Sequence, residues 1–395
     1  MKYITLLGDG MADYPIPELS GKTPLQVADT PNMDFIASKG VNGLLKTIPD
    51  GMSAGSDVAN LCILGYDPKK YYTGRGPLEA AAIGVKLEKD DIAFRCNLIT
   101  ENNEEIGDYS AGHISTDEAG QLIRLLDDKL GNERVSFHPG MSYRHLVVIK
   151  GSEGAICVPP HDVVGERVDD NLPTGEGSDL LKELILASRD VLAGHEINKI
   201  RDADGKNQAN MIWLWGHGRA PDMPLFEDLY GVSGAVVSAV YLIKGIGTYA
   251  GLDVIDVPGA TGYLDTSYEN KGKYAIDSLE DHDFVFVHVE APDEAGHMGD
   301  IEEKMKAIES FDRMVGQILD GIDEPYRVVV LPDHFTPIPV KTHTKEPVPF
   351  AVYSTEDGGD EVKTFDEESA KNGSLKTIPG HMLMGKFLSG QEYLV

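Results

Sequence analysis

Apolar runs typical of β-strands alternate with helical segments along this chain, and this alternation limits the fold more than any other feature of the sequence. It is typical of an α/β protein with a largely parallel sheet. Eight runs are strand candidates: 3–7, 94–99, 145–149, 211–215, 254–257, 284–289, 327–331 and 350–353. The runs 284–289 and 327–331 are almost continuously apolar or β-branched, which suits central strands that are covered on both faces.

Helix-start signals lie between these runs. Thr30 is followed by Pro31, which places a capping residue and a first-turn proline at the start of a helix. Ser115 with Glu118 forms a capping-box pattern, and Asp300 can cap a long helix that extends to about residue 319. The sequence therefore predicts helices near residues 31, 116 and 301.

Size and charge limit the classes of function. A chain of 395 residues is long for one compact core, so two domains are expected. The formal net charge of −30 argues against nucleic acid and anionic membranes as partners, because both require a basic surface. An anionic small substrate would need a local cluster of arginine, lysine and metal ions.

Cysteine usage and hydropathy indicate the compartment. The three cysteines, Cys62, Cys96 and Cys157, are widely separated and match neither a disulfide framework nor a zinc pattern. No uncharged apolar stretch is long enough to predict a transmembrane helix. We expect a reduced, cytoplasmic setting. No heptad pattern or apolar stripe predicts an oligomeric state, which stays open.

Three of the predicted strands run directly into ionisable residues, and a fourth such segment precedes the strand candidate 350–353. Ligands gather at the carboxyl ends of strands in open α/β sheets, so these side chains could converge there. The candidates are Asp9, Asp293, His297, Asp333, His334 and His343. Taken singly, each is as readily a helix cap or a surface residue. Mixed aspartate and histidine ligands suit Mn²⁺ or Zn²⁺ more than Ca²⁺.

Ser56 lies at the start of a predicted helix, after the small residues of the segment 52–55. A serine in this place is usually an N-cap. It is also a place for a nucleophile, because the free N–H groups of a helix start face an incoming phosphate. A metal ion bound to the serine oxygen would lower its pKa, so that no separate base is needed.

Together these segments resemble the alkaline phosphatase superfamily, and within it the shorter, archaeal-type form of the cofactor-independent phosphoglycerate mutases. The resemblance rests on Asp9-Gly10, 55–61 with 64–68, 292–297, Asp333-His334, and His343-Thr344 with 347–349. It implies two divalent metals, commonly Mn²⁺ with Mg²⁺ or Zn²⁺ as alternatives, and no 2,3-bisphosphoglycerate. It also implies one ion held by Asp293, His297 and His343, and the other by Asp9, Ser56, Asp333 and His334, with Ser56 as the phosphorylated nucleophile.

The resemblance further implies an α/β fold, an alkaline phosphatase-like three-layer sandwich whose central sheet is mainly parallel, with a smaller α/β domain inserted. The expected borders are 1–76 and 226–395 for the catalytic domain and 77–225 for the insertion. The inserted domain should carry substrate-binding groups.

Four residues are candidates for substrate binding by their position in the family pattern. His113 matches a substrate-binding histidine that could also move protons, and the alternative is a surface loop histidine. Arg144 and Arg219 resemble arginines that hold phosphate and carboxylate, for which the planar guanidinium is suited. Lys244 matches a lysine near the phosphoserine, or is an exposed lysine at a helix end. Arg75 could be a substrate ligand or a hinge residue.

The function expected from this resemblance is the interconversion of 2- and 3-phosphoglycerate through a phosphoserine. The partner is then a small phosphorylated carboxylic acid. One alternative keeps the metals and Ser56 but changes the acceptor, as in relatives proposed to be homoserine kinases, and another is a simple hydrolase. A non-enzymatic alternative is a metal-storing or structural binding module, for which Ser56 would have no role.

Overall fold

The computed structural model describes residues 1–151 and 154–389, which form two compact units. The first unit combines Met1–Tyr72 with Asp222–Val395, and the second is Thr73–Pro221. The second unit is therefore continuous in sequence, whereas both ends of the chain build the first. The borders of this second unit lie a few residues before those of the range 77–225 that the sequence analysis predicted.

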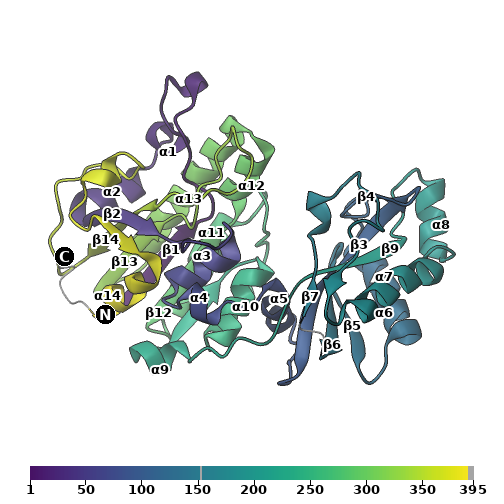
Figure 1. Cartoon of the computed structure of the whole chain (residues 1–395). Coiled ribbons are helices and arrows are strands. Elements are labelled where there is room, and N and C mark those ends of the chain that lie inside the picture. The colour runs from purple at the N-terminus through teal and green to yellow at the C-terminus, as the bar shows by residue number, and fades with distance from the viewer. Residues whose placement is uncertain (152–153, 390–395) are drawn as a thin grey trace. The chain divides into compact units, whose positions relative to one another are not determined.

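A mostly parallel sheet forms the centre of the first unit (Figure 1). Its strand order is β11-β10-β12-β1-β13-β14-β2-β15. Among these strands β14 runs antiparallel to both of its neighbours, while the other pairs are parallel. The strands are β1 (Lys2–Gly8), β2 (Val41–Lys46), β10 (Gly234–Val237), β11 (Asp253–Ile255), β12 (Phe284–Val289), β13 (Tyr326–Leu331), β14 (Val348–Ser354) and β15 (Thr377–Pro379).

Helices cover both faces of this sheet, as expected for a sheet whose central strands are apolar on both sides. On one face Ile4 of β1 and Val285 of β12 pack in a core with Phe311 of α13. On the other face the ring of Phe284 stacks on Phe226 of α9. The helices are α1 (Pro24–Val27), α2 (Pro31–Lys39), α3 (Ser56–Ile63), α4 (Pro68–Tyr71), α9 (Phe226–Tyr230), α10 (Tyr241–Tyr249), α11 (Tyr268–Ser278), α12 (Ala291–Met298), α13 (Ile301–Asp320) and α14 (Leu383–Ser389), with 3-10 turns at Pro17–Leu19, Ser369–Asn372 and Gly380–Met382.

The second unit contains an antiparallel sheet in which β3 pairs with β4, β6 and β9, and β6 also pairs with β5. Leu122 of α6 and Ile185 of α7 pack in the core on one face, and Ala80 of α5 packs against Leu146 on the other. The elements are α5 (Arg75–Ala82), β3 (Asp91–Asn102), β4 (Glu105–Asp108), α6 (Thr116–Leu130), β5 (Val135–Met141), β6 (Arg144–Lys150), β7 (Ala155–Ile156), β8 (Thr174–Gly175), α7 (Ser178–Leu192), α8 (Glu196–Ala203) and β9 (Met211–Gly218), with a 3-10 turn at Pro160–Asp162.

The fold class predicted from the sequence is confirmed: an α/β sandwich with a mainly parallel central sheet and a smaller additional domain. The helix-start signals act as expected at two of the three places. The side chains of Ser115 and Asp300 accept hydrogen bonds from the backbone N–H groups of Glu118 and Glu303. Thr30 precedes α2 without such a bond from its side chain. Within the described residues, none of the helices is both long and apolar enough to cross a membrane.

Candidate metal centre

Ligand-type side chains gather at the carboxyl ends of three neighbouring parallel strands. Asp9 directly follows β1, Asp333 follows β13, and Asp293 lies in the first turn of α12, which follows β12. Because β1 lies between β12 and β13 in the sheet, their carboxyl ends meet at one edge. His297 lies one helical turn after Asp293, and His334 is adjacent to Asp333. Residues from both ends of the sequence thus come together at this edge of the sheet.

The first group consists of Asp293, His297 and His343. The Nε2 atom of His297 lies 3.2 Å from Asp293 Oδ2, and that of His343 lies 3.4 Å from Asp293 Oδ1. The two Nε2 atoms are 2.9 Å apart. Nδ1 of His297 donates to the carbonyl oxygen of Lys341 at 3.0 Å, so in a neutral ring Nε2 carries a free lone pair. Such an imidazole, oriented through its other nitrogen, is typical of a metal ligand.

Charges in this first group are strongly coupled. Burial acts to raise the pKa of Asp293, but hydrogen bonds from His297 and His343 outweigh it and hold the pKa well below its usual range. Burial acts to lower the pKa of His297, yet the Asp293 carboxylate raises it to about 9. The carboxylate is therefore ionised and held among imidazoles.

The second group consists of Asp9, Asp333, His334 and Ser56. Nε2 of His334 lies 3.2 Å from Ser56 Oγ and 3.4 Å from both Asp9 Oδ1 and Asp333 Oδ2. Asp9, Asp333 and His334 are fully buried, and Ser56 is buried at the first residue of α3. Candidate ligand atoms lie within 4.8 Å of one another in two sets, Asp9 with Asp333 and His334, and Asp293 with His334 and His343. The structure thus brings all seven predicted ligands to one place.

Buried donors that sequence reasoning did not single out orient these carboxylates. Asn60 donates through Nδ2 to Asp333 Oδ2 at 2.9 Å and to the backbone oxygen of Ser56 at 2.9 Å. It lies four residues after Ser56 on the same helix face, and this spacing could have revealed it. The hydroxyl of Thr336 donates a hydrogen bond to Asp293 Oδ1. This contact could not be predicted from a sequence pattern.

The backbone conformation of Gly10 lets the chain pass close to Asp293 and Asp333. Its φ of +60° lies in the left-handed region, and a Cβ atom there would meet Asp293 Oδ1 and Thr336 Oγ1 at 2.6 Å. Its N–H donates to Asp333 Oδ1 at 3.1 Å. Only glycine allows the backbone to approach both aspartates this closely.

A third set of candidate ligand atoms adjoins the second group and consists of Asp9, His288 and Glu290. His288 Nε2 lies 2.8 Å from Asp9 Oδ2 and 3.6 Å from Glu290 Oε2. Burial, followed by repulsion from Asp293, raises the pKa of Glu290 to about 8. Burial lowers the pKa of His288 well below its usual range. His288 was not among the residues that the sequence analysis singled out.

Two of the predicted substrate residues lie beside one aromatic side chain in the second unit. His113, exposed in a turn after β4, makes an edge contact with the ring of Tyr143, with centroids 5.8 Å apart. The guanidinium of Arg144, at the start of β6, lies 5.4 Å from the centroid of the same ring.

A second cation in this unit was missed by sequence reasoning. Arg95 of β3 is buried, pairs with Glu79 at 2.9 Å and stacks over Trp215 at 4.4 Å. Burial, together with the nearby positive charges of Arg75 and Arg144, lowers the pKa of Arg95 against the effect of Glu79. Arg75 and Arg144 therefore lie close enough to Arg95 to act on its charge, in a chain whose overall charge is strongly negative.

The other two predicted substrate residues make different contacts. Arg219 follows β9 and donates to the carbonyl oxygen of Lys89, and its side chain is about one-third exposed. Lys244 of α10 pairs with Asp256 at 3.0 Å, in the first unit.

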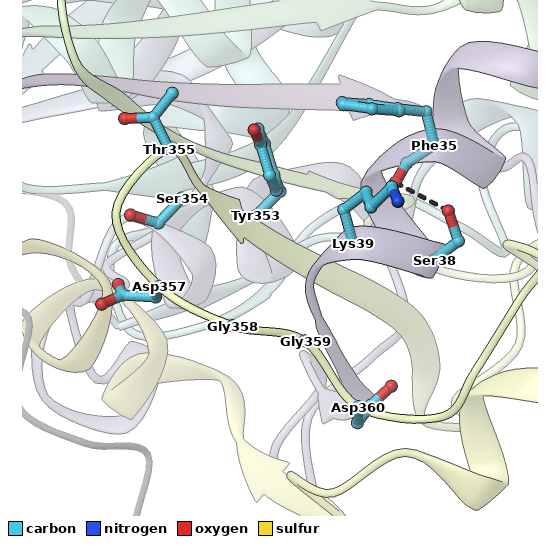
Figure 2. Close-up of a pocket in the computed structure, with 10 residues that line it drawn as sticks. All are labelled: Phe35, Ser38, Lys39, Tyr353, Ser354, Thr355, Asp357, Gly358, Gly359 and Asp360. Carbon is cyan, nitrogen blue, oxygen red and sulfur yellow. Dashed lines mark hydrogen bonds between the residues drawn. The ribbon is translucent and has the colours of Figure 1, made fainter.

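Figure 2 shows a further feature of the first unit, an open pocket between α2 and the end of β14. Its volume is about 530 Å³. Ser354, which lines this pocket, lies opposite Arg327 in the register of β14 with β13, near the start of β13. The pocket therefore lies at the opposite edge of the sheet from Asp333, which follows the end of β13.

Comparison with known families gives matches over most of the chain. The profile of a family described as "2,3-bisphosphoglycerate-independent phosphoglycerate mutase" matches residues 37–198. A profile described as "Type I phosphodiesterase / nucleotide pyrophosphatase" matches residues 247–376, the region that holds Asp293, Asp333 and His343.

Individual relatives cover nearly the full length. Proteins named 2,3-bisphosphoglycerate-independent phosphoglycerate mutase from Methanosarcina acetivorans and Methanosarcina barkeri are 59% and 58% identical, over 98% of this chain and 99% and 98% of theirs. Among solved structures, the PH0037 protein from Pyrococcus horikoshii has a TM-score of 0.86 and 34% identity, covering 100% of this chain and 98% of that one. The cofactor-independent phosphoglycerate mutase from Thermoplasma acidophilum has a TM-score of 0.67 and 29% identity, covering 98% and 99%.

Proposed function

Because the chain belongs to the family of 2,3-bisphosphoglycerate-independent phosphoglycerate mutases, we propose that it interconverts 2- and 3-phosphoglycerate through a phosphoserine at Ser56. The observation that carries this proposal is the position of Ser56 Oγ, 3.2 Å from His334 within the buried group of ligand-type side chains. The names of the relatives favour the mutase over transfer to another acceptor such as homoserine.

The family implies divalent metal ions and no 2,3-bisphosphoglycerate, and the donor set fits such ions. Burial and the neighbouring charges of Asp333 and Glu290 raise the pKa of Asp9 well above its usual range, and Asp9 Oδ1 is buried with no hydrogen-bond partner. A cation would relieve both costs. We propose that Asp293, His297 and His343 hold one ion, and that Asp9, Ser56, Asp333 and His334 hold the other.

Bound ions of this kind lower the pKa of an attached hydroxyl and neutralise phosphoryl oxygens. Mixed carboxylate and imidazole ligands support Mn²⁺ as the metal, with Zn²⁺ and Mg²⁺ as the alternatives to test. Removal of metal by a chelator should abolish activity. We expect Mn²⁺ to restore more activity than Mg²⁺ or Zn²⁺ at equal free concentration, and equal recovery by all three would contradict the choice of Mn²⁺.

The residues of the chain then carry the transfer in two steps. Ser56 loses its hydroxyl proton and its Oγ attacks the substrate phosphorus, the bond between phosphorus and the glycerate oxygen breaks, and that oxygen takes up a proton. The other hydroxyl of the same glycerate next loses its proton and attacks the phosphorus, the bond between phosphorus and Ser56 Oγ breaks, and Ser56 takes up a proton again. The free N–H groups at the start of α3 favour a phosphate at this position. Water must be excluded between the steps, because hydrolysis of the phosphoserine would make the protein a phosphatase.

We propose the substrate contacts on the chemistry of the side chains. Arg144 and Arg219 suit the carboxylate and phosphate of the substrate, because a guanidinium binds each through two hydrogen bonds. His113 is proposed to move protons to and from the glycerate oxygens, and Lys244 to bind the phosphoryl group. The positive charge around Arg95 supports an anion site in the second unit.

A coupled assay tests the function. Purified protein with Mn²⁺ and 3-phosphoglycerate should form 2-phosphoglycerate, which enolase converts to a product followed by its absorbance. Ser56→Ala should abolish turnover, while Ser53→Ala, which changes an exposed serine of the same loop, should leave it unchanged. Release of inorganic phosphate faster than isomerisation would favour a hydrolase, and no turnover by metal-loaded protein would refute the proposal.

Mass spectrometry gives an independent check of the intermediate. Protein quenched during turnover should carry one phosphate on the peptide that contains Ser56, and a phosphate found only elsewhere would exclude Ser56 as the nucleophile.

We also propose that the protein is cytoplasmic. All three cysteines are free, which agrees with a reduced cytoplasm.

A further inference from the structure

A buried chain of hydrogen bonds leads from Ser238 through His288 to Asp9. His288 Nε2 lies 2.8 Å from Asp9 Oδ2, and His288 Nδ1 lies 3.3 Å from Ser238 Oγ. Asp9 and His288 are 0% exposed and Ser238 is 2% exposed. The three residues come from the ends of the neighbouring strands β1, β12 and β10, so the sheet itself aligns them.

The partners of each group determine the direction of these bonds. When a bound ion keeps the Asp9 carboxylate ionised, that carboxylate only accepts, so Nε2 of His288 carries the hydrogen. In a neutral ring Nδ1 then accepts, and its donor is the hydroxyl of Ser238. That hydroxyl oxygen in turn accepts from the backbone N–H of Val240 at 3.1 Å. Each member of the chain therefore has one available orientation.

The backbone of His288 is held as firmly as its ring. The Nζ atom of Lys271, a fully buried lysine of α11, donates to the backbone oxygen of His288 at 3.0 Å. The same ammonium group lies close enough to Glu290 to interact with its carboxylate. This cation thus lies beside Glu290, the second acidic side chain near His288.

We propose that His288, oriented by Ser238, is a positioning residue that fixes the Asp9 carboxylate so that Oδ1 stays directed at the ion site. This inference rests on the proposed two-metal function. It agrees with the geometry of Asp9, whose Oδ2 is bonded to His288 while Oδ1 lies 3.4 Å from His334 Nε2 and has no hydrogen-bond partner. Partners of this kind, which bind a ligand rather than the metal, commonly change metal affinity by roughly 10- to 100-fold.

The competing role for His288 is as a ligand to a third ion, together with Asp9 and Glu290. Two observations favour positioning. His288 Nε2 lies 2.8 Å from Asp9 Oδ2, a full hydrogen-bond distance, whereas the Nε2 atoms of the proposed ligands His297, His334 and His343 lie 3.2–3.4 Å from carboxylate oxygens. A third divalent cation would also lie close to the buried ammonium of Lys271, and like charges at short range repel strongly in a buried site.

Metal titration of the chelated protein tests the proposal. Binding of Mn²⁺ is followed by isothermal titration calorimetry and by the electron paramagnetic resonance signal of free Mn²⁺. Together they give the number of bound ions and their dissociation constants. We expect two ions for the wild type. His288→Leu should still bind two, with one of them weakened roughly 10- to 100-fold. His288→Gln keeps an N–H donor of similar reach and should recover part of that loss.

Two further variants separate positioning from folding. Ser238→Ala leaves the ring in place but removes its donor, and should weaken the same ion several-fold, so it serves if His288→Leu does not fold. His282→Leu removes a histidine that pairs with Asp253 at 3.0 Å away from the predicted ligands, and should leave both affinities unchanged. The urea midpoints of the metal-free variants are measured in parallel, to reveal a role in folding alone.

The outcomes are distinct. Equal affinities in wild type, His288→Leu and Ser238→Ala would overturn the inference, as would three ions in the wild type and two in His288→Leu. Loss of affinity that His288→Gln does not recover, accompanied by a lower urea midpoint, would reduce His288 to a structural residue. Binding of fewer than two ions by the wild type would instead refute the proposed function on which the inference depends.

Discussion

Lys304→Met should destabilise the first unit strongly, because Lys304 is a buried cation with three hydrogen-bond acceptors. Its Nζ atom lies 2.7 Å from Asp13 Oδ2, 2.8 Å from the backbone oxygen of Thr336 and 3.4 Å from that of Ala12. The side chains of Lys304 and Asp13 are both 0% exposed. Methionine has a similar length and volume, so the change removes the charge and the donors rather than the packing.

The magnitude follows from what remains after the change. Removing one partner of a buried ion pair costs about 3–5 kcal/mol, because the other charge is left buried without compensation. Asp13 keeps backbone donors, since the N–H groups of Tyr14 and Ile338 donate to its carboxylate. We therefore expect a loss near the lower limit, about 3 kcal/mol in the free energy of unfolding.

Urea unfolding of the metal-free protein, followed by circular dichroism, measures this loss. Both tryptophans, Trp213 and Trp215, lie in the second unit, so their fluorescence reports that unit, and its transition should move less. Lys306→Met is the matched control, because Lys306 lies on the same helix in an exposed pair with Glu303, and it should cost under about 0.5 kcal/mol. A loss below about 1 kcal/mol for Lys304→Met, or an equal loss in both variants, would refute the reasoning from buried charge.

Three further predictions concern other buried groups. Thr336→Val removes the hydroxyl donor to Asp293 and should cost about 1–2 kcal/mol in metal-free unfolding; unchanged stability would contradict the role given to this bond. Arg95→Met leaves the Glu79 carboxylate unpaired and should lower the urea midpoint of the second unit, measured by tryptophan fluorescence. Lys304→Met should instead act mainly on the transition of the first unit. A midpoint shift for Arg95→Met that is seen only by circular dichroism would contradict this prediction. Burial raises the pKa of Glu367 to about 7, above its value of about 4.3 in an unfolded chain. The folded state therefore holds the proton more tightly, and stability should fall as pH rises from about 4.3 to 7 and level off above. Glu367→Gln should flatten that part of the pH profile, and parallel profiles would argue against the raised pKa.

The fold was largely predictable wherever strands are apolar and bounded by turns. The run 284–289 coincides with β12 because its residues other than His288 are apolar or β-branched, and all are buried. Strand β2 was missed because Asn42 and Gly43 lower strand propensity. The tertiary structure explains the glycine, since a Cβ at Gly43 would meet the backbone oxygen of Lys376 at 2.6 Å. Strand β5 was missed because it contains Pro139, which the edge of a sheet tolerates.

The candidate site was predictable where ionisable or nucleophilic residues adjoin the end of a strand or the start of a helix. Asp9 and Asp333 follow apolar strands directly, so their convergence could be inferred from the rule for parallel sheets. The side chains that orient them could not be inferred in the same way. The contact between Ser238 and His288 depends on the strand order β10-β12-β1, and a sequence pattern does not reveal which strands become neighbours.

The discontinuity of the first unit has a consequence for synthesis on the ribosome. Strand β1 is made long before its neighbours β12 and β13, which begin at Phe284 and Tyr326. At about 5–20 residues per second, its first partner is made roughly 15–60 s later. The second unit is complete by Pro221 and can fold during this interval. Strand β1 meanwhile stays an apolar segment without its sheet partners, so the nascent chain must be kept from aggregating until the ligands on both sides of the insertion exist.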